Sequence, residues 1–246
     1  MKFTPILCFL LLLVACASDE ELALKDKIKK DEELYQAALN FFDDGNYAAA
    51  SEEFLEIERL YPFSPMATKA KVMAAYSFYQ QEEFEESLAV INDFINFHPA
   101  DADIPYIYYL RGLNYYDRIS DIARDQQMAS KAKGAFEDVI ARFPHSDYGL
   151  DAKLKVTLLN DQLAGKEMEI GRFYLRQKKI NGAINRFKQV VENYQRTEHI
   201  KEALYRLTES YMILGIASEA EKYAAILGHN YPNSKWYKKA YEILNT

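Results

Sequence analysis

One segment recurs five times along the chain with small and large apolar residues in the same order. The five copies cover residues 45–64, 82–101, 127–146, 178–197 and 215–234. One column of their alignment contains only small residues, and the columns four and seven residues later are apolar: Ala50, Ser87, Ala132, Ala183 and Ala220, then Phe54, Ile91, Phe136, Phe187 and Ala224, then Ile57, Phe94, Val139, Val190 and Leu227. This spacing places one apolar stripe on each predicted helix. Because one such unit cannot bury its stripe alone, the repeats are expected to stack.

A second helix is predicted before each copy, and a loop closes each helix pair. Proline stops the helix in four of the closing loops, and glutamine takes its place in one: Pro62, Pro99, Pro144, Pro232 and Gln195. Small residues in the preceding helices allow close packing: Ala38, Ala75, Gly171 and Thr208. Successive loops lie 37 residues apart at both ends of the chain, but 45 and 51 residues apart between them. We place the extra residues between Ile119 and Met128 and in a longer first helix of the fourth pair.

This pattern resembles the tetratricopeptide repeat, a helix pair with small residues, an aromatic residue and a closing proline at fixed positions. The resemblance predicts an all-α fold, a right-handed TPR solenoid of five helix hairpins plus a C-terminal capping helix. The content of only 9 Gly and 7 Pro also favours helices over a turn-rich β fold. Within a solenoid at 31–246, the hairpins are expected at about residues 31–64, 68–101, 105–146, 150–197 and 201–234, and the cap at 235–246.

The N-terminus predicts export and a lipid anchor. An apolar run from Phe3 to Val14 is as long as the apolar part of a secretory signal and too short for a membrane span of roughly 20 residues. It leads through Ala15 to Cys16, and this stretch resembles the bacterial lipoprotein box. The resemblance implies that residues 1–15 are a signal peptide and that Cys16 carries an S-diacylglycerol and an N-acyl chain such as palmitate. Residues 16–30 would then be the lipidated N-terminus and a tether.

The predicted anchor also indicates a location. Several acyl chains hold a protein on a membrane without crossing it. Ala17, rather than an aspartate, follows the cysteine, which resembles the sorting pattern for the outer membrane of a Gram-negative bacterium. We therefore expect a lipid-anchored outer-membrane protein that faces the periplasm. Since Cys8 would leave with the signal peptide, no disulfide is expected.

The sequence contains no motif typical of catalysis, metal binding or phosphate binding. The patterns HExxH, CxxC, GxSxG and the P-loop are absent. The histidines are scattered at predicted helix ends, where they would converge on a metal ion only by chance: His98, His145, His199 and His229. We therefore expect a protein that is not an enzyme, with no catalytic residue, no metal and no cofactor apart from the lipid on Cys16.

Charge is distributed unevenly along the chain. Residues 31–104 contain 16 acidic and 3 basic side chains, whereas residues 166–246 contain 9 acidic and 14 basic ones. Such polarity orients protein partners through long-range fields that salt weakens. An acidic, exported chain is a poor match for nucleic acid, so protein partners are expected instead.

The first helices of the early hairpins carry aromatic and apolar residues at helical spacing: Tyr35, Leu39, Phe42, Tyr76, Tyr79, Tyr109 and Tyr116. One interpretation is ordinary packing between hairpins. The other is a groove for an extended substrate peptide, in which rigid rings gain contact area at low entropic cost. Under the second interpretation, replacing Tyr76 and Tyr79 by alanine weakens binding of an aromatic-rich peptide and leaves the fold intact.

Two longer runs, residues 108–126 and 141–187, resemble the BamD family of outer-membrane assembly lipoproteins, also called YfiO or ComL. The specific features are the RDQ triplet in the first insertion, the FPxSxY…DA loop and the long fourth-repeat helix. The resemblance implies a non-enzymatic scaffold of the BAM complex, which folds β-barrel proteins and inserts them into the outer membrane. The implied partners are the POTRA region of BamA on the C-terminal half, other BAM subunits, and unfolded barrel proteins on the N-terminal half.

The same resemblance selects a contact residue. In the run INRF, Arg186 matches the family's arginine implicated in binding BamA, and Arg172, Arg176 and Lys179 are its basic neighbours. The plain alternative is a solvated helix arginine.

Two other functions of the whole protein stay open. A periplasmic TPR lipoprotein that coordinates peptidoglycan or cell-division enzymes would share fold and anchor but lack the RDQ insertion, whereas a lytic enzyme would need a catalytic domain for which no segment is left.

Overall fold

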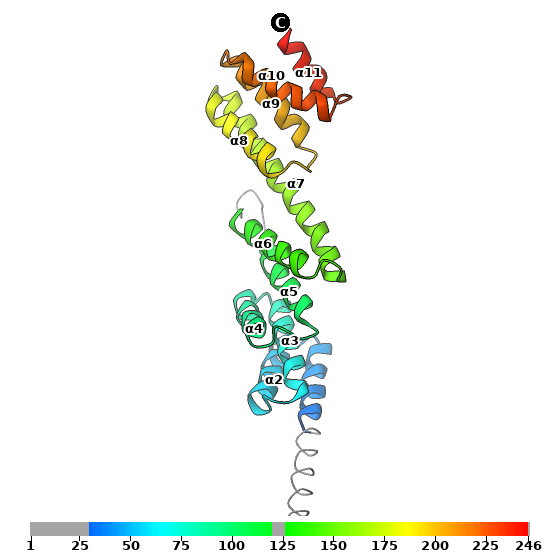
Figure 1. The fold of residues 1–246 in the computed structure, drawn as a ribbon. Helices are drawn as coiled ribbons and strands as arrows, with labels where there is room; N and C mark the ends of the chain where they lie inside the picture. Colours follow the sequence, from blue (N-terminus) through cyan, green and yellow to red (C-terminus); the bar gives the residue numbers. More distant parts are fainter. Residues whose placement is uncertain (1–29, 120–125, 246) are drawn as a thin grey trace, which may run out of the picture. The chain divides into compact units, whose positions relative to one another are not determined.

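The computed structural model describes residues 30–119 and 126–245 (Figure 1). These residues form helices joined by loops, and the predicted all-α fold of helix hairpins is confirmed. They divide into two compact units, one ending at Asn114 and the other starting at Tyr115. The predicted signal peptide, the predicted lipid-attachment residue Cys16, the predicted tether up to residue 29 and most of the RDQ triplet lie outside the described residues.

The first unit contains a helix at residues 30–43, α2 (Tyr47–Leu60), α3 (Pro65–Gln80), α4 (Phe84–Phe97) and most of α5 (Ile104–Tyr116). Its core is the apolar stripe that the repeat predicts. Phe54 and Ile57 of α2 are fully buried. They pack with the small residues Ala38, Ala70 and Ala74, which let the helix at 30–43 and α3 approach α2 closely.

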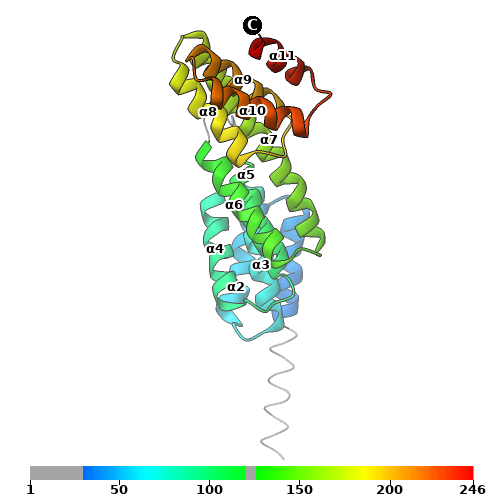
Figure 2. The same cartoon turned by 45° about the horizontal axis from the view of Figure 1, so that its top comes forward.

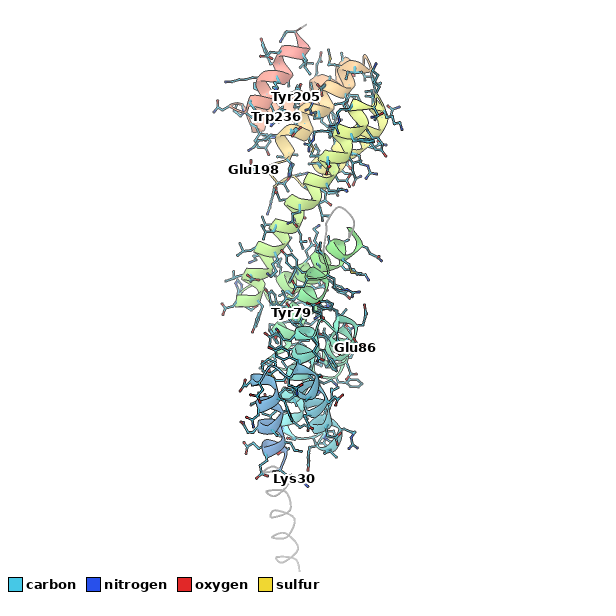
Figure 3. The ribbon with its side chains drawn as sticks, turned by 180° about the vertical axis from the view of Figure 1, so that it is seen from behind. Lys30, Tyr79, Glu86, Glu198, Tyr205 and Trp236 are labelled. Carbon is cyan, nitrogen blue, oxygen red and sulfur yellow. The ribbon has the colours of Figure 1, made fainter. Side chains whose placement is uncertain are left out.

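The second unit contains α6 (Gln126–Arg142), α7 (Asp147–Arg176), α8 (Ile180–Asn193), α9 (Ile200–Ile213), α10 (Ala217–Asn230) and α11 (Lys235–Leu244), as Figures 1 and 2 show. With 30 residues, α7 accounts for the longest spacing between closing loops. The last helix, α11, packs against α9 and α10. There the rings of Tyr205 and Trp236 lie 5.3 Å apart (Figure 3). Among the described residues, no helix combines the length and the apolar character that a membrane span needs.

Four hairpin turns place one residue each in the left-handed backbone region. Two of these residues are glycines, Gly45 and Gly215, with φ of 74° and 72°. The other two are Glu82 and Lys178, with φ of 61° and 58°. Only glycine adopts this conformation without a steric cost, so the turns at Glu82 and Lys178 carry a cost that the turns at Gly45 and Gly215 avoid.

A buried lysine connects the helices of the first unit. Lys71 of α3 is only 4% exposed, and its Nζ donates to Oε1 of Glu58 on α2, 2.6 Å away, and to Asp93 on α4. Burial by itself would lower the pKa of the Lys71 ammonium, but the hydrogen bonds to Asp93 and Glu58 outweigh it and raise the pKa above the ordinary value of 10.5. Lys71 therefore stays charged and holds α2 and α4 to α3.

Replacing Lys71 by methionine is expected to lower the free energy of unfolding by about 2 kcal/mol at neutral pH, because both carboxylates lose their shared partner but stay partly in water. Since the folded-state pKa is raised, the contribution is complete below the ordinary lysine pKa and disappears as the pH rises through the folded-state value. Urea denaturation at neutral and strongly alkaline pH measures both effects. The control is Lys69→Met on the exposed face of α3; equal stability of the two variants would contradict the network's role.

Candidate functional site

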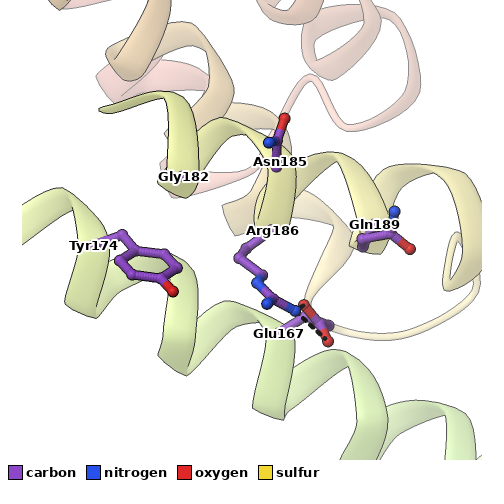
Figure 4. A pocket seen from close by; sticks show the side chains of 6 residues that line it. All are labelled: Glu167, Tyr174, Gly182, Asn185, Arg186 and Gln189. Carbon is purple, nitrogen blue, oxygen red and sulfur yellow. Dashed lines mark hydrogen bonds and ion pairs between the residues drawn. The ribbon is translucent and has the colours of Figure 1, made fainter. Parts of the chain in front are cut away.

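The core fixes the direction in which α8 presents Arg186. Phe187 and Val190 are fully buried, so Arg186 lies at the flank of the buried face. The long helix α7 passes close to this flank because Gly171 has no side chain there. A Cβ atom at Gly171 would lie 2.4 Å from Cε1 of Phe187. Arg186 therefore extends from α8 toward α7, as Figure 4 shows.

Arg186 forms an ion pair with a well-covered carboxylate of α7. Its Nη1 donates to Oε2 of Glu167 over 3.1 Å, and the Glu167 side chain is 12% exposed, against 38% for Arg186. A charge-assisted hydrogen bond of this kind fixes the guanidinium plane. Because the other guanidinium nitrogens have no hydrogen-bond partner among the described residues, Arg186 retains donors for an incoming group.

An open pocket adjoins this ion pair between α7 and α8. Its volume is about 380 Å³, and it is lined by Glu167, Tyr174, Gly182, Asn185, Arg186 and Gln189. Nearby, burial first and then the charge of Glu167 raise the pKa of the Tyr194 hydroxyl above 10.0, so this phenol stays neutral at physiological pH. The pocket thus offers a fixed charge pair and neutral amides, a lining suited to polar groups of a protein partner.

The other basic candidates differ from one another. Nη1 of Arg172 donates to Oε2 of Glu202 over 3.2 Å, which connects α7 to α9. Arg176 and Lys179, by contrast, are exposed at the turn between α7 and α8, and neither forms an ion pair within the described part of the chain. The structure therefore gives Arg172 a role in packing and leaves Arg176 and Lys179 available at the surface.

The aromatic residues predicted to line a groove in the first unit pack largely on one another. Tyr76 of α3 lies 5.7 Å from the ring of Phe42, 5.9 Å from Tyr79 and 6.4 Å from Tyr106 on α5. Tyr106 was not identified from the sequence, although it lies one helical turn before Tyr109. Because these rings connect three helices, they contribute to hairpin packing as well as to the surface.

The remaining groove candidates are distributed over both units. Tyr35 packs on the core residue Phe54 at 5.4 Å, and Leu39 adjoins the same core. Tyr109 is half-buried in the first unit. Tyr116 belongs to the second unit, where its ring lies 6.1 Å from the buried Phe136. The structure thus brings together Phe42, Tyr76 and Tyr79. Phe42 also packs against the core of the first unit, as Tyr35 and Leu39 do, and Tyr116 packs against a core residue of the second unit.

No set of three or more histidine, cysteine or carboxylate side chains gathers as a metal ion would require, within the residues described. Nε2 of His199 and Oδ2 of Asp161 are 3.9 Å apart at the surface of the second unit.

Residues 27–227 match the family YfiO, described as an outer membrane lipoprotein. The chain is 47% identical to the outer membrane protein assembly factor BamD of Rickettsia prowazekii, over 99% of this chain and 98% of that protein. It is 40% identical to BamD of Caulobacter vibrioides, with 86% and 70% covered. A solved TPR protein of Thermus thermophilus aligns with a TM-score of 0.40 and 16% identity, covering 88% of this chain and 100% of that chain.

Proposed function

Because the chain belongs to the YfiO family of outer membrane lipoproteins, the family of the BamD assembly factors, we propose that it is an outer membrane protein assembly factor of the BAM complex. In this role it is a scaffold without enzyme activity that assists the folding and insertion of β-barrel proteins. The near full-length similarity to the BamD protein of Rickettsia prowazekii supports the proposal.

The proposed partner on the second unit is the POTRA region of BamA. The observation that carries this assignment is Arg186, held by Glu167 at the edge of an open polar pocket with donors to spare. Arg176 and Lys179 are exposed at the adjoining turn. An acidic segment of the partner suits this surface, because a carboxylate that reaches Arg186 forms its ion pair where water is partly excluded, which strengthens the pair.

The proposed location is the periplasmic side of the outer membrane, with acyl chains on Cys16 as the anchor. The family description as an outer membrane lipoprotein supports it. The apolar run before Cys16 and the small residue Ala15 support it from the sequence.

Affinity purification from the native envelope tests the proposal. The full-length lipoprotein is solubilised in detergent and isolated beside an Arg186→Glu variant, and the co-purifying proteins are identified. We expect a large POTRA-bearing barrel protein with the wild type and its depletion from the variant. Recovery of cell-wall enzymes without any barrel protein would instead favour the function of a coordinator of peptidoglycan or division enzymes.

We also propose that unfolded barrel segments bind the rings of Phe42, Tyr76 and Tyr79 in the first unit. Replacing Tyr76 and Tyr79 by alanine is expected to weaken binding of a peptide that ends in an aromatic-rich strand by about tenfold, since each lost ring contact contributes about 0.5–1.5 kcal/mol. A fluorescence titration of a labelled peptide measures this, with circular dichroism as a check on folding. Tyr241→Ala, at an exposed ring on α11, is the control. Unchanged affinity of the double variant would refute substrate binding at these rings.

A further inference from the structure

The exposed face of α8 carries a regular row of amide side chains. Asn181, Asn185, Gln189 and Asn193 follow one another at intervals of four residues, and all four are exposed. We call this row the amide ladder. Buried residues occupy the opposite face of α8, which orients the ladder outward. Within the ladder, Nδ2 of Asn193 donates to Oε1 of Gln189 over 2.8 Å.

The middle of the ladder and its C-terminal end each adjoin a pocket. Asn185 and Gln189 line the 380 Å³ pocket beside Arg186. Asn193 lines a second pocket of about 310 Å³, together with Asn160 of α7. The Oδ1 atom of Asn160 is buried and accepts no hydrogen bond from the described residues. A buried acceptor without a donor is costly, so this pocket favours a ligand that supplies an N–H group.

The spacing of the ladder matches an extended polypeptide. Residues four apart on a helix are separated by about 6 Å along its axis. In an extended strand, alternate residues present main-chain N–H and C=O groups to the same side at intervals of about 6.6 Å. Amide side chains both donate and accept hydrogen bonds, as the main chain of such a strand requires. Along the helix axis the two repeats diverge by only about 2 Å over the three intervals of the ladder. The row also winds around α8 by about 40° per interval, so a strand that follows it crosses the helix axis at an angle.

The surroundings of the ladder specify the charge of its ligand. The turn before α8 exposes Arg176, Lys178 and Lys179, none of which forms an ion pair within the described residues. Arg186 and Arg196 line the two pockets, each together with one glutamate, Glu167 in the first pocket and Glu192 in the second. A segment lying on the ladder therefore gains from carboxylate side chains, above all near Asn181 and Arg186.

We infer that the amide ladder binds an extended, carboxylate-bearing polypeptide segment through its main chain, while the two pockets receive side chains of that segment. In the setting of the proposed function, the segment is an exposed strand of the POTRA-bearing partner. This inference rests on the proposed function only for the identity of the partner. The recognition of a main chain follows from the ladder and its pockets.

The test uses the detergent-solubilised full-length protein and two synthetic probes. The first is an acetylated peptide of alternating Thr and Val with Asp at either end, long enough to span the ladder at about six to eight residues. The second has the same sequence with methyl groups on alternate main-chain nitrogens, which removes donors. The variant is Asn185→Ala with Gln189→Ala, and the control is Gln36→Ala with Asn40→Ala, an exposed amide pair at the same spacing in the first unit.

We expect the ladder variant to bind the unmethylated peptide about tenfold more weakly than the wild type, and the control to bind like the wild type. Methylation should weaken binding by the wild type but change binding by the ladder variant little, because the variant already lacks the hydrogen bonds that methylation removes. The inference is overturned if the wild type binds neither peptide, or if the ladder variant distinguishes the peptides as the wild type does.

The purified POTRA domains of the barrel protein separate this inference from the proposed function. If they bind the wild type but neither Arg186→Glu nor the ladder variant, both ideas are supported. If binding of the POTRA domains is lost only in Arg186→Glu and persists in the ladder variant, the proposed function is supported and the ladder is overturned as the partner's site. If they bind none of the proteins, the proposed docking partner is wrong, and the two peptides alone decide whether the ladder recognises a main chain.

Discussion

Reversing the charge at Arg186 is expected to lower the affinity for the POTRA domains by about 100-fold, while the protein stays folded. Arg186→Glu removes the donors beside the pocket and sets two carboxylates against each other, because Glu167 is only 12% exposed and stays at the same place. A carboxylate of the proposed partner would then meet repulsion at the place of the guanidinium. Calorimetric titration of the detergent-solubilised protein with purified POTRA domains measures the change.

The control for this prediction is Lys222→Glu, which changes the net charge equally but lies on α10, where Lys222 pairs with Glu219. It should reduce affinity by less than about threefold, as expected for a distant exposed charge. Arg186→Lys should fall between wild type and Arg186→Glu, because lysine keeps the charge but loses the planar fork. Equal losses for Arg186→Glu and Lys222→Glu would show that only total charge matters.

Truncating Phe187 to alanine is expected to lower the free energy of unfolding by about 3–5 kcal/mol. The ring is fully buried and lies against the backbone of Gly171, so its removal opens a cavity between α7 and α8 that neither helix can readily close. The same change should weaken POTRA binding, because Arg186 is the next residue and takes its direction from this contact. Chemical denaturation followed by circular dichroism gives the stability.

The control is Phe173→Ala, at a ring of α7 that is 49% exposed. Removing this ring should lower the free energy of unfolding by about 1 kcal/mol or less, since about half of its surface is already exposed to water in the folded protein. Adding Gly171→Ala to Phe187→Ala should then cost little, although Gly171→Ala alone introduces a clash with the ring. If Phe187→Ala were as stable as Phe173→Ala, the repeat's apolar column would not be the core.

The fold follows from the sequence because one apolar stripe per helix is enough to decide which face is buried. The column that contains Phe54, Phe136 and Phe187 is buried in all five repeats. Less could be predicted at positions where tertiary contacts, and not the repeat pattern, decide the backbone conformation or the burial of a residue. The left-handed turns at Glu82 and Lys178 carry no glycine, and Lys71 occupies a buried position that charge alone would assign to the surface.

The site was predicted only in part. Arg186 emerged from its resemblance to a family motif, whereas its partner Glu167 was missed, since the two residues are 19 positions apart on different helices. A signal existed: Glu167 precedes Gly171 by one helical turn, and the small residue at 171 marks the face of α7 that meets α8. The amide ladder is visible as a pattern, but its meaning depends on exposure and pockets that require coordinates.

The most direct test of the docking face is photo-crosslinking in growing cells. A photoreactive amino acid replaces Asn185, at the centre of the proposed interface, or Glu221, which is exposed on α10, and the covalent products are identified. We expect a product with a POTRA-bearing barrel protein from position 185 and none from position 221. Products with cell-wall enzymes from position 185, or barrel-protein products only from position 221, would contradict it.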